Sequence, residues 1–272
     1  KGILGEPDPA TGRDGAKRTL RPQVEELSDL MGCGGDGGGG CRRTVDYLVV
    51  SAGGNDVGFA FTVGSLIALD PLLVVNPIYQ NLLDNLVTDV GDDIDGLPEL
   101  FGRLADALGG IDIEKVLLAG YPGSSSVARD GRITTCDEIG GDLLPGLEVD
   151  RTELEVVREG LLVPLNDTLL SIADTHGWSF VDAHVAAFEG HGYCGSDPYG
   201  GEGYSGNPFP EEVAAVADPG VRWFRTAEES AVIQGGGGLF RPERLATSGT
   251  FHPNELGHRA YGSALVDEIG TK

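Results

Sequence analysis

Three short apolar runs set between helix-like segments constrain the fold of this chain more than any other feature. They are VDYLVVS (45–51), VLLAGY (116–121) and SFVD (179–182). Short runs rich in Val and Leu that end at glycines or polar residues are typical of buried strands in a parallel sheet. Because helical patterns separate them, the sequence predicts an α/β fold: a three-layer α/β/α sandwich around a parallel, flavodoxin-like sheet.

The segments outside these runs carry the patterns of helices and loops. Leu97–Leu108 is expected to form one helix with Pro98 in its first turn. A long helix before the third strand is expected to kink or break at Pro164. Asn254–Ile269 is expected to form the last helix. The long irregular segment 185–250 is of a length that is often functional in a compact domain.

Length, composition and charge define the class of protein. The chain has 272 residues, of which 40% are hydrophobic, which suits a single globular domain over 1–272. It carries 19 Lys and Arg against 43 Asp and Glu, a formal net charge of −24. Such a surface repels phosphate backbones, so nucleic acid is not an expected partner. Solubility is the simplest reason for the acidity, and a salt-rich habitat or weak divalent-cation binding are the alternatives.

The four cysteines favour disulfides over a zinc or redox site, because their number is even and they form no CxxC pair. Cys33 and Cys41 flank a glycine-rich loop, so a local bridge is the simplest pairing, and it leaves Cys136 to pair with Cys194. Disulfides indicate an oxidising compartment and therefore a secreted protein. Four free thiols in a cytosolic protein are the alternative, because spacing alone does not establish pairing.

The sequence shows neither a membrane span nor a signal peptide. No apolar run reaches the length of about 18 residues that a span requires. The chain begins with Lys1 rather than Met, and we expect that an upstream segment has been removed.

The first motif with residue types suited to catalysis is SAGGNDVGF (51–59), at the end of the first apolar run. Ligands bind at the carboxyl ends of parallel strands, and glycines there let the backbone approach a substrate closely. The side-chain amide of Asn55 is of the type that donates a hydrogen bond to a developing oxyanion. A simple Gly-Asn turn after a strand is the alternative.

The second motif is FHPNELGH (251–258), immediately before the last predicted helix. A histidine in such a loop is well placed to act as a general base, which makes His252 the candidate. An ordinary surface or capping histidine is one alternative, and a metal pair with His258 is another. The spacing of these two histidines differs from the i, i+4 spacing of a helical zinc pair, and no third ligand is evident, so no metal is predicted.

Together these motifs resemble those of the SGNH hydrolase superfamily, also called GDSL-like lipases and esterases. The GxND block of that family matches Gly53 to Asp56, and its last block, in the HPNxxGH form, matches His252 to His258. The flanks GGNDVGF and RWFRTAEES are similar to those of actinobacterial-type secreted esterases. The similarity covers essentially the whole chain after residue 15.

The chain departs from the family at two places. No GDS block with the nucleophilic serine occurs in it, and we expect that the first strand and its serine precede Lys1. A true pseudoenzyme is the alternative. The family's Asp, expected three positions before the histidine, is replaced by Gly249. A backbone carbonyl that orients the imidazole would take the place of that carboxylate.

The resemblance implies acyl transfer on a small-molecule or lipid ester, without a cofactor or a metal, by a monomer. The upstream serine would attack the ester, His252 would act as general base, and Asn55 would donate to the oxyanion with backbone support from Gly53 and Gly54. The competing class is a catalytically dead module that binds carbohydrate or lipid on the same fold, for which Tyr193 and Trp223 are candidate contacts.

Overall fold

A computed structural model describes the regular elements and the loops around them. The described residues are 8–11, 17–20, 22–33, 40–54, 56–58, 62, 77–136, 138–139, 149–198, 218–226, 229–230 and 251–270.

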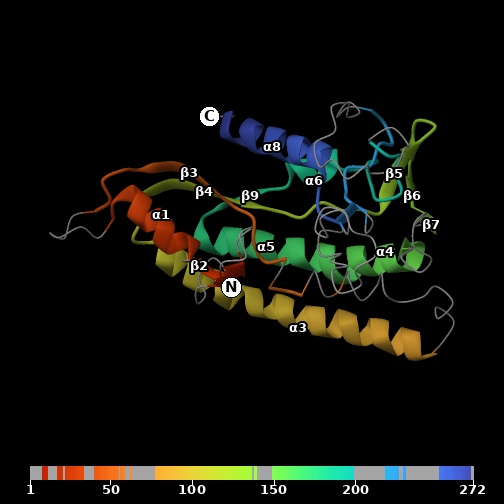
Figure 1. Ribbon diagram of the computed structural model, residues 1–272, viewed down its shortest axis with the longest axis horizontal. Coiled ribbons are helices and arrows are strands. Elements are labelled where there is room, and N and C mark those ends of the chain that lie inside the picture. Colours follow the sequence, from red (N-terminus) through yellow and green to blue (C-terminus); the bar gives the residue numbers. More distant parts are fainter. Residues whose placement is uncertain are drawn as a thin grey trace.

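A three-stranded parallel sheet lies at the centre of the molecule (Figure 1). Its strands are β3 (Val45–Val50), β4 (Ile113–Ala119) and β9 (Ser179–Val181), with β4 in the middle. The register pairs Val45 with Ile113 and Leu117 with Ser179. Each strand falls in one of the three apolar runs or starts just before it, so the predicted strands are confirmed.

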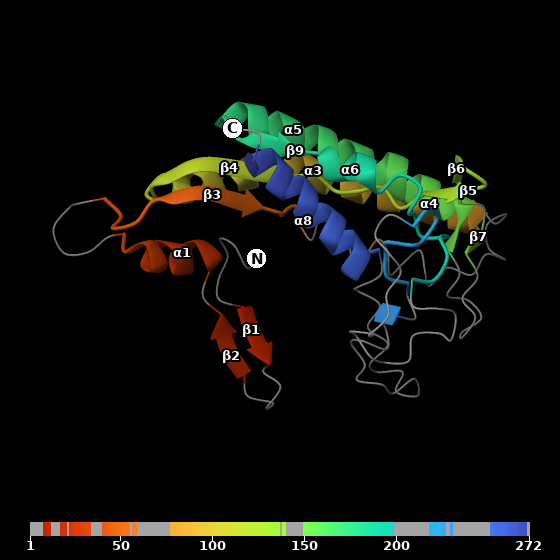
Figure 2. The same ribbon diagram turned by 90° about the horizontal axis from the view of Figure 1, so that it is seen from above.

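Helices cover both faces of this sheet. The long helix α3 (Pro77–Leu108) packs against α5 (Val163–His176) on one face, and α6 (Ala183–Ala187) packs against α8 (Glu255–Gly270) on the other (Figures 1 and 2). This arrangement confirms the predicted α/β fold with helices on both sides of a parallel sheet.

Helix α3 corrects the prediction that Leu97–Leu108 forms a separate helix. The helix runs without a break from Pro77, and Pro98 lies inside it. A proline in a helix interior costs about 3 kcal/mol, whereas burying one large apolar side chain contributes about 1.5–3 kcal/mol. The buried side chains of α3 recur every three or four residues, and together they outweigh the proline: Val90, Ile94, Leu97, Phe101, Leu104 and Leu108.

The sequence predicted a kink or a break at Pro164, and the structure shows a change of helix type instead, because the chain stays helical from Arg151 to His176. Helix α4 (Arg151–Val157) leads into a π-helical turn, η2 (Arg158–Leu162), and α5 begins directly after it with Pro164 in its first turn. The N–H of Val163 bonds to the carbonyl of Arg158, which is the spacing of a π-turn. A wider turn leaves room for the proline ring, which clashes with the preceding turn of a regular α-helix.

Short antiparallel hairpins and one short helix complete the described elements. They are β1 (Asp8–Thr11) with β2 (Lys17–Leu20), β5 (Ser126–Arg129) with β6 (Arg132–Thr135), β7 (Glu138–Ile139) with β8 (Val149–Asp150), and α1 (Gln23–Met31). Two disulfides, Cys33–Cys41 and Cys136–Cys194, confirm the predicted pairing. Among the described helices, none is both long and apolar enough to cross a bilayer.

Strand β3 lies at the edge of the sheet, and no described strand pairs with its other side. Helix α1 runs alongside this edge (Figure 2). Between α1, β3 and α3 lies a groove of about 320 Å³, lined mainly by apolar side chains: Gln23, Val24, Leu27, Leu48, Val49, Val50, Ser51, Leu104 and Leu108. In the described part of the chain, this edge of the sheet is therefore unpaired.

Candidate active site

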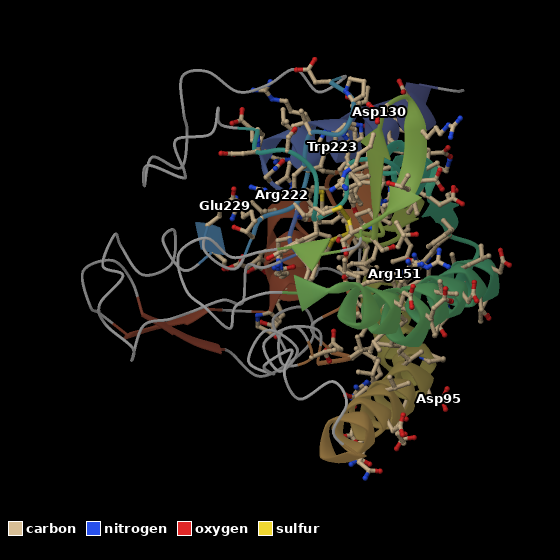
Figure 3. All side chains as sticks on the ribbon, turned by 90° about the vertical axis from the view of Figure 1, so that its right-hand side faces the viewer. Asp95, Asp130, Arg151, Arg222, Trp223 and Glu229 are labelled. Atoms are coloured by element: carbon tan, nitrogen blue, oxygen red, sulfur yellow. A yellow bond between two sulfur atoms is a disulfide. The ribbon has the colours of Figure 1, made fainter. Side chains whose placement is uncertain are left out.

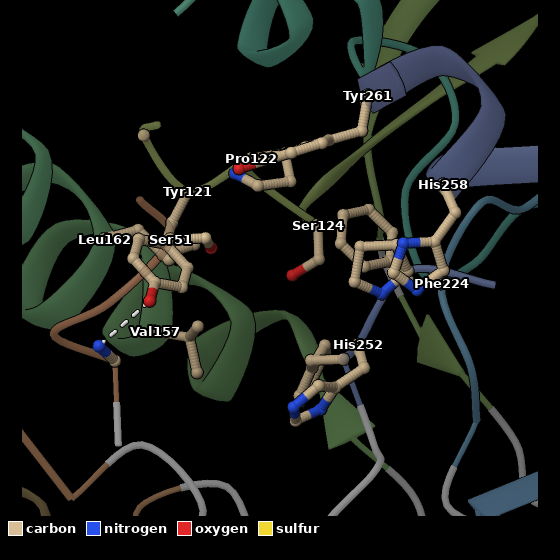
Figure 4. Close-up of a pocket in the computed structure, with 14 residues that line it drawn as sticks. Ser51, Tyr121, Pro122, Ser124, Val157, Leu162, Phe224, His252, His258 and Tyr261 are labelled. Carbon is tan, nitrogen blue, oxygen red and sulfur yellow. Dashed lines mark hydrogen bonds between the residues drawn. The ribbon is translucent and has the colours of Figure 1, made fainter. Parts of the chain in front are cut away.

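A pocket of about 380 Å³ opens where β3 and β4 end, on the side of the sheet at which parallel strands present ligand sites (Figure 4). Segments far apart in the sequence meet in it. Its lining residues are Ser51, Gly54, Gly120, Tyr121, Pro122, Ser124, Val157, Leu162, Phe224, Phe251, His252, Pro253, His258 and Tyr261. Most of this wall is apolar, and among the described residues it contains neither Asp nor Glu.

His252 enters the pocket from the loop before α8, and its side chain is exposed. Backbone hydrogen bonds hold this loop against residues 222–226. The N–H of Arg225 donates to the carbonyl of His252 at 2.9 Å, and the N–H of Phe251 donates to the carbonyl of Arg225 at 3.1 Å. Phe251 has a φ of 62°, in the left-handed region that non-glycine residues rarely adopt, so this pairing holds a strained turn beside His252.

A buried ion pair stabilises residues 222–226, the segment that is hydrogen-bonded to the loop of His252. The guanidinium of Arg222 bonds to the carboxylate of Glu229, and its Nε donates to the carbonyl of Phe224 at 3.0 Å (Figure 3). The same carboxylate accepts the N–H of Thr226 at 2.9 Å, and the hydroxyl of Thr226 accepts the N–H of Glu229 at 3.1 Å. This Thr-x-x-Glu exchange is a capping box, a signal that is present in the sequence at RTAEE.

Asn254 and Gly257, which follow His252 in the motif, have structural roles. Asn254 is fully buried and begins α8: its Oδ1 accepts the N–H groups of Leu256 and Gly257 at 3.0 and 3.1 Å. Its Nδ2 donates to the carbonyl of Arg222 at 2.8 Å. A Cβ on Gly257 would lie 2.5 Å from the carbonyl oxygen of Trp223, so only glycine fits there. These contacts explain the N-x-x-G part of the motif without assigning it a chemical role.

His258 lines the pocket beside His252. Burial lowers the pKa of His258, and the positive charge of Arg225 and the neighbouring His252 lower it further. The His258 ring is therefore neutral at pH 7, and it adds a polar but uncharged group to the pocket wall.

The two predicted support glycines form a tight turn at the end of β3. Gly53 has a φ of 107°, and its carbonyl accepts the N–H groups of Asp56 and Val57, each at 3.0 Å. The N–H of Gly54 donates to the hydroxyl of Tyr121 at 3.0 Å, the dashed line in Figure 4. Asn55 lies outside the described residues, so its meeting with His252 stays a prediction. Gly249 and Glu243, the nearest acidic residue before His252 in the sequence, also lie outside them.

Hydroxyl groups mark the end of the pocket nearest the sheet. Burial raises the pKa of Tyr121, and the hydrogen bond from Gly54 opposes that shift. Burial also raises the pKa of Tyr261, where the nearby hydroxyl of Ser51 acts in the opposite direction. Both phenols are therefore neutral at pH 7. Ser51 and Ser124 add two more hydroxyls, so the described pocket is suited to an uncharged ligand.

No group of three or more potential metal-binding side chains is present among the described residues. The described part of the pocket provides two histidines, hydroxyl groups and an apolar wall, a set suited to proton transfer on an uncharged substrate.

Comparison with known proteins gives a coarse result. No protein-family model matches the chain, and no curated protein matches it. Among solved structures, the extracellular lipase from Streptomyces rimosus is similar with a TM-score of 0.47 and 18% identity, over 80% of this chain and 69% of the lipase. Phospholipase A1 from Streptomyces albidoflavus is similar with a TM-score of 0.36 and 20% identity, over 63% of this chain and 60% of the phospholipase. Both of these proteins are lipolytic enzymes, and at these values neither assigns a residue role to this chain.

Proposed function

We propose that this protein is a secreted serine esterase or lipase of the SGNH type, which hydrolyses carboxylic esters by acyl transfer. One observation carries the proposal: His252 lies in the same apolar pocket as the residues that end β3 and β4. The general-base candidate and the glycine turn next to Asn55 come from opposite ends of the chain, so only the fold brings them to one pocket. The two disulfides support an oxidising, extracellular location.

In the proposed reaction a serine hydroxyl attacks the ester carbonyl, and His252 accepts its proton. The oxyanion that forms accepts a hydrogen bond from Asn55. Collapse of this intermediate breaks the bond to the alcohol, and His252 returns the proton to the leaving oxygen. Water then attacks the acyl-serine with His252 again as the base, which releases the acid and restores the serine.

We assign the nucleophilic serine to a segment that precedes residue 1. None of the described strands pairs with the outer edge of β3, and the groove beside this edge has an apolar lining suited to a buried strand. Because parallel strands end at the same edge of a sheet, the loop after an added strand would lie next to Ser51 and the pocket. The serine would then face His252 across the pocket.

The pocket wall favours an uncharged ester with an apolar acyl group. Val157, which directly precedes the π-helical turn, and Leu162, its last residue, face the pocket together with Phe224 and Phe251. The two tyrosines are neutral, and the described wall carries no carboxylate and no lysine. A fatty-acyl or other apolar ester matches this environment better than a phosphate or a carboxylate does.

The first test compares the 272-residue chain with a chain extended upstream to include the serine. The extended protein is expected to hydrolyse p-nitrophenyl butyrate, whereas the shorter chain is expected to lack useful activity because it lacks the nucleophile. Ser51→Ala and Ser124→Ala in the extended protein test the two serines of the pocket. If the shorter chain hydrolyses the ester, and Ser51→Ala or Ser124→Ala abolishes hydrolysis, the nucleophile lies within the 272 residues. The assignment of an upstream serine is then wrong. If neither chain hydrolyses esters, the binding-module function takes the place of the enzyme.

Replacing Asn55 by Ala in the extended protein should lower kcat about 100- to 1,000-fold, which is the usual loss for one oxyanion donor. The KM should change little, because the charge on the oxyanion develops only in the transition state. Steady-state kinetics with p-nitrophenyl butyrate measures both constants. Asn85→Ala, an exposed position on α3, is the matched control and should leave kcat unchanged. Equal losses in the two variants would remove Asn55 from the mechanism.

A further inference from the structure

We infer that Tyr121 is a positioning residue for the oxyanion turn: its phenol fixes Gly54, and through Gly54 it sets the backbone that carries Asn55. The inference rests on the proposed function, since it assigns a role in the same site. Its observational basis is a chain of hydrogen bonds from α5 through Tyr121 to the end of β3. Figure 4 shows the last link, between Tyr121 and Gly54.

Helix α5 fixes the backbone of Tyr121 through Asn166. The N–H of Tyr121 donates to Oδ1 of Asn166 at 2.8 Å, and Nδ2 of Asn166 donates to the carbonyl of Tyr121 at 2.8 Å. A side-chain amide that bonds both backbone groups of one residue makes the hydrogen bonds that a neighbouring strand would otherwise make at that point. Gly120 makes room for this contact, because a Cβ there would lie 3.2 Å from Oδ1 of Asn166 and 2.9 Å from the ring of Phe180.

The phenol of Tyr121 then reaches across to the end of β3 and accepts the N–H of Gly54 at 3.0 Å. A Cβ on Gly54 would lie 3.0 Å from this hydroxyl oxygen and 3.0 Å from the ring carbon Cε1, closer than most such contacts. Glycine at this position therefore allows the phenol to approach the backbone. The neutral state of the phenol keeps its own hydrogen available to a second acceptor in the pocket.

The turn is closed on its other side by Gly53. The carbonyl of Gly53 accepts N–H groups from Asp56 and Val57, each at 3.0 Å, so hydrogen bonds hold the described residues 53, 56 and 57 together. The N–H of Gly54 already donates to Tyr121, so Gly54 supports the turn. The proposed oxyanion donor remains Asn55.

Loss of the hydroxyl of Tyr121 should therefore affect kcat and leave substrate binding nearly unchanged. A donor aimed at the oxyanion acts only if it is held in place before the reaction begins. Loss of the Tyr121 hydroxyl loosens the turn by one hydrogen bond, while the ring still fills its place in the pocket. The kcat should therefore fall while the KM stays nearly constant.

The experiment is a double-mutant cycle in the protein extended to include the serine. Tyr121→Phe is expected to lower kcat for p-nitrophenyl butyrate about fivefold to tenfold, the size expected for one hydrogen bond, with KM within about twofold. In the background of Asn55→Ala, the same substitution should have little further effect, because the donor that Tyr121 positions is absent. Tyr47→Phe, on β3 and outside the pocket, is the matched control.

Amide hydrogen exchange of residues 52–58 gives a second readout that does not depend on activity. Exchange at Gly54 should be faster in Tyr121→Phe than in the wild type and unchanged in Tyr47→Phe. Unchanged exchange, or equal losses of kcat with and without Asn55, would overturn the inference. If the wild-type protein lacks esterase activity but the exchange at Gly54 still increases, the proposed function fails while the contact between Tyr121 and the turn stands. The role of Tyr121 in positioning an oxyanion donor is then refuted.

Discussion

Replacing His252 by Ala in the protein extended to include the upstream serine is expected to lower kcat/KM for p-nitrophenyl butyrate by about 1,000- to 10,000-fold. The physical reason is that the serine loses its general base, and the leaving alcohol loses its proton donor. His252 is an exposed side chain on a loop, so its removal should change the thermal melting temperature very little. Initial rates and a melting curve measured on the same sample separate the two effects.

His176→Ala is the matched control, because His176 lies in the last turn of α5, near Trp178, and outside the pocket. Its activity should stay within about twofold of the wild type, as for most surface substitutions. If His252→Ala keeps more than a tenth of the wild-type activity, His252 is not the general base.

The same experiment extends to the group that orients His252. Glu255, the nearest carboxylate in the described sequence, forms an ion pair with Arg259 one turn further along α8. Glu255→Gln and Glu243→Gln should therefore keep most of the activity if a backbone carbonyl orients the imidazole. Should either variant lose turnover while its melting curve is unchanged, a carboxylate performs this role and the carbonyl hypothesis is wrong.

Removing the bridge between Cys136 and Cys194 by replacing both with Ala should lower the free energy of unfolding by about 4 kcal/mol, with a fall in melting temperature of about 10 °C. The bridge spans 58 positions, and Cys136 is fully buried. Its loss releases a long loop in the unfolded chain and removes two sulfur atoms from the buried cluster around Phe188 and Trp223. Urea denaturation followed by circular dichroism measures the change.

The Cys33–Cys41 bridge provides an internal comparison, because it spans only 8 positions. Its removal should cost about 2.5 kcal/mol, since loop-closure entropy grows with the logarithm of loop length. A larger loss for this short bridge than for the long one would mean that packing, rather than loop entropy, sets the contribution of these disulfides.

The sequence alone determined the features that depend on local pattern. The apolar runs predicted the three strands, because a strand buried on both faces needs continuous apolar residues wherever it lies in the fold. The spacing of the cysteines predicted both bridges, and Pro164 indicated that the helix before the third strand is not a regular α-helix, which the π-helical turn bears out. The hairpin of β5 and β6 could also have been predicted from the sequence, because Asp-Gly is a typical hairpin turn. Asp130 and Gly131 form this turn, and both have positive φ.

Only the tertiary structure decided which distant groups meet. No local pattern indicates that the phenol of Tyr121 accepts the N–H of Gly54, or that the ion pair of Arg222 and Glu229 braces the loop of His252. Pro98 shows the same limit, because the burial of neighbouring side chains outweighed its local preference for a helix start. The physical reason is that periodicity reports which face of an element is buried, whereas contacts across the pocket depend on how the parallel strands align and where their ends lie.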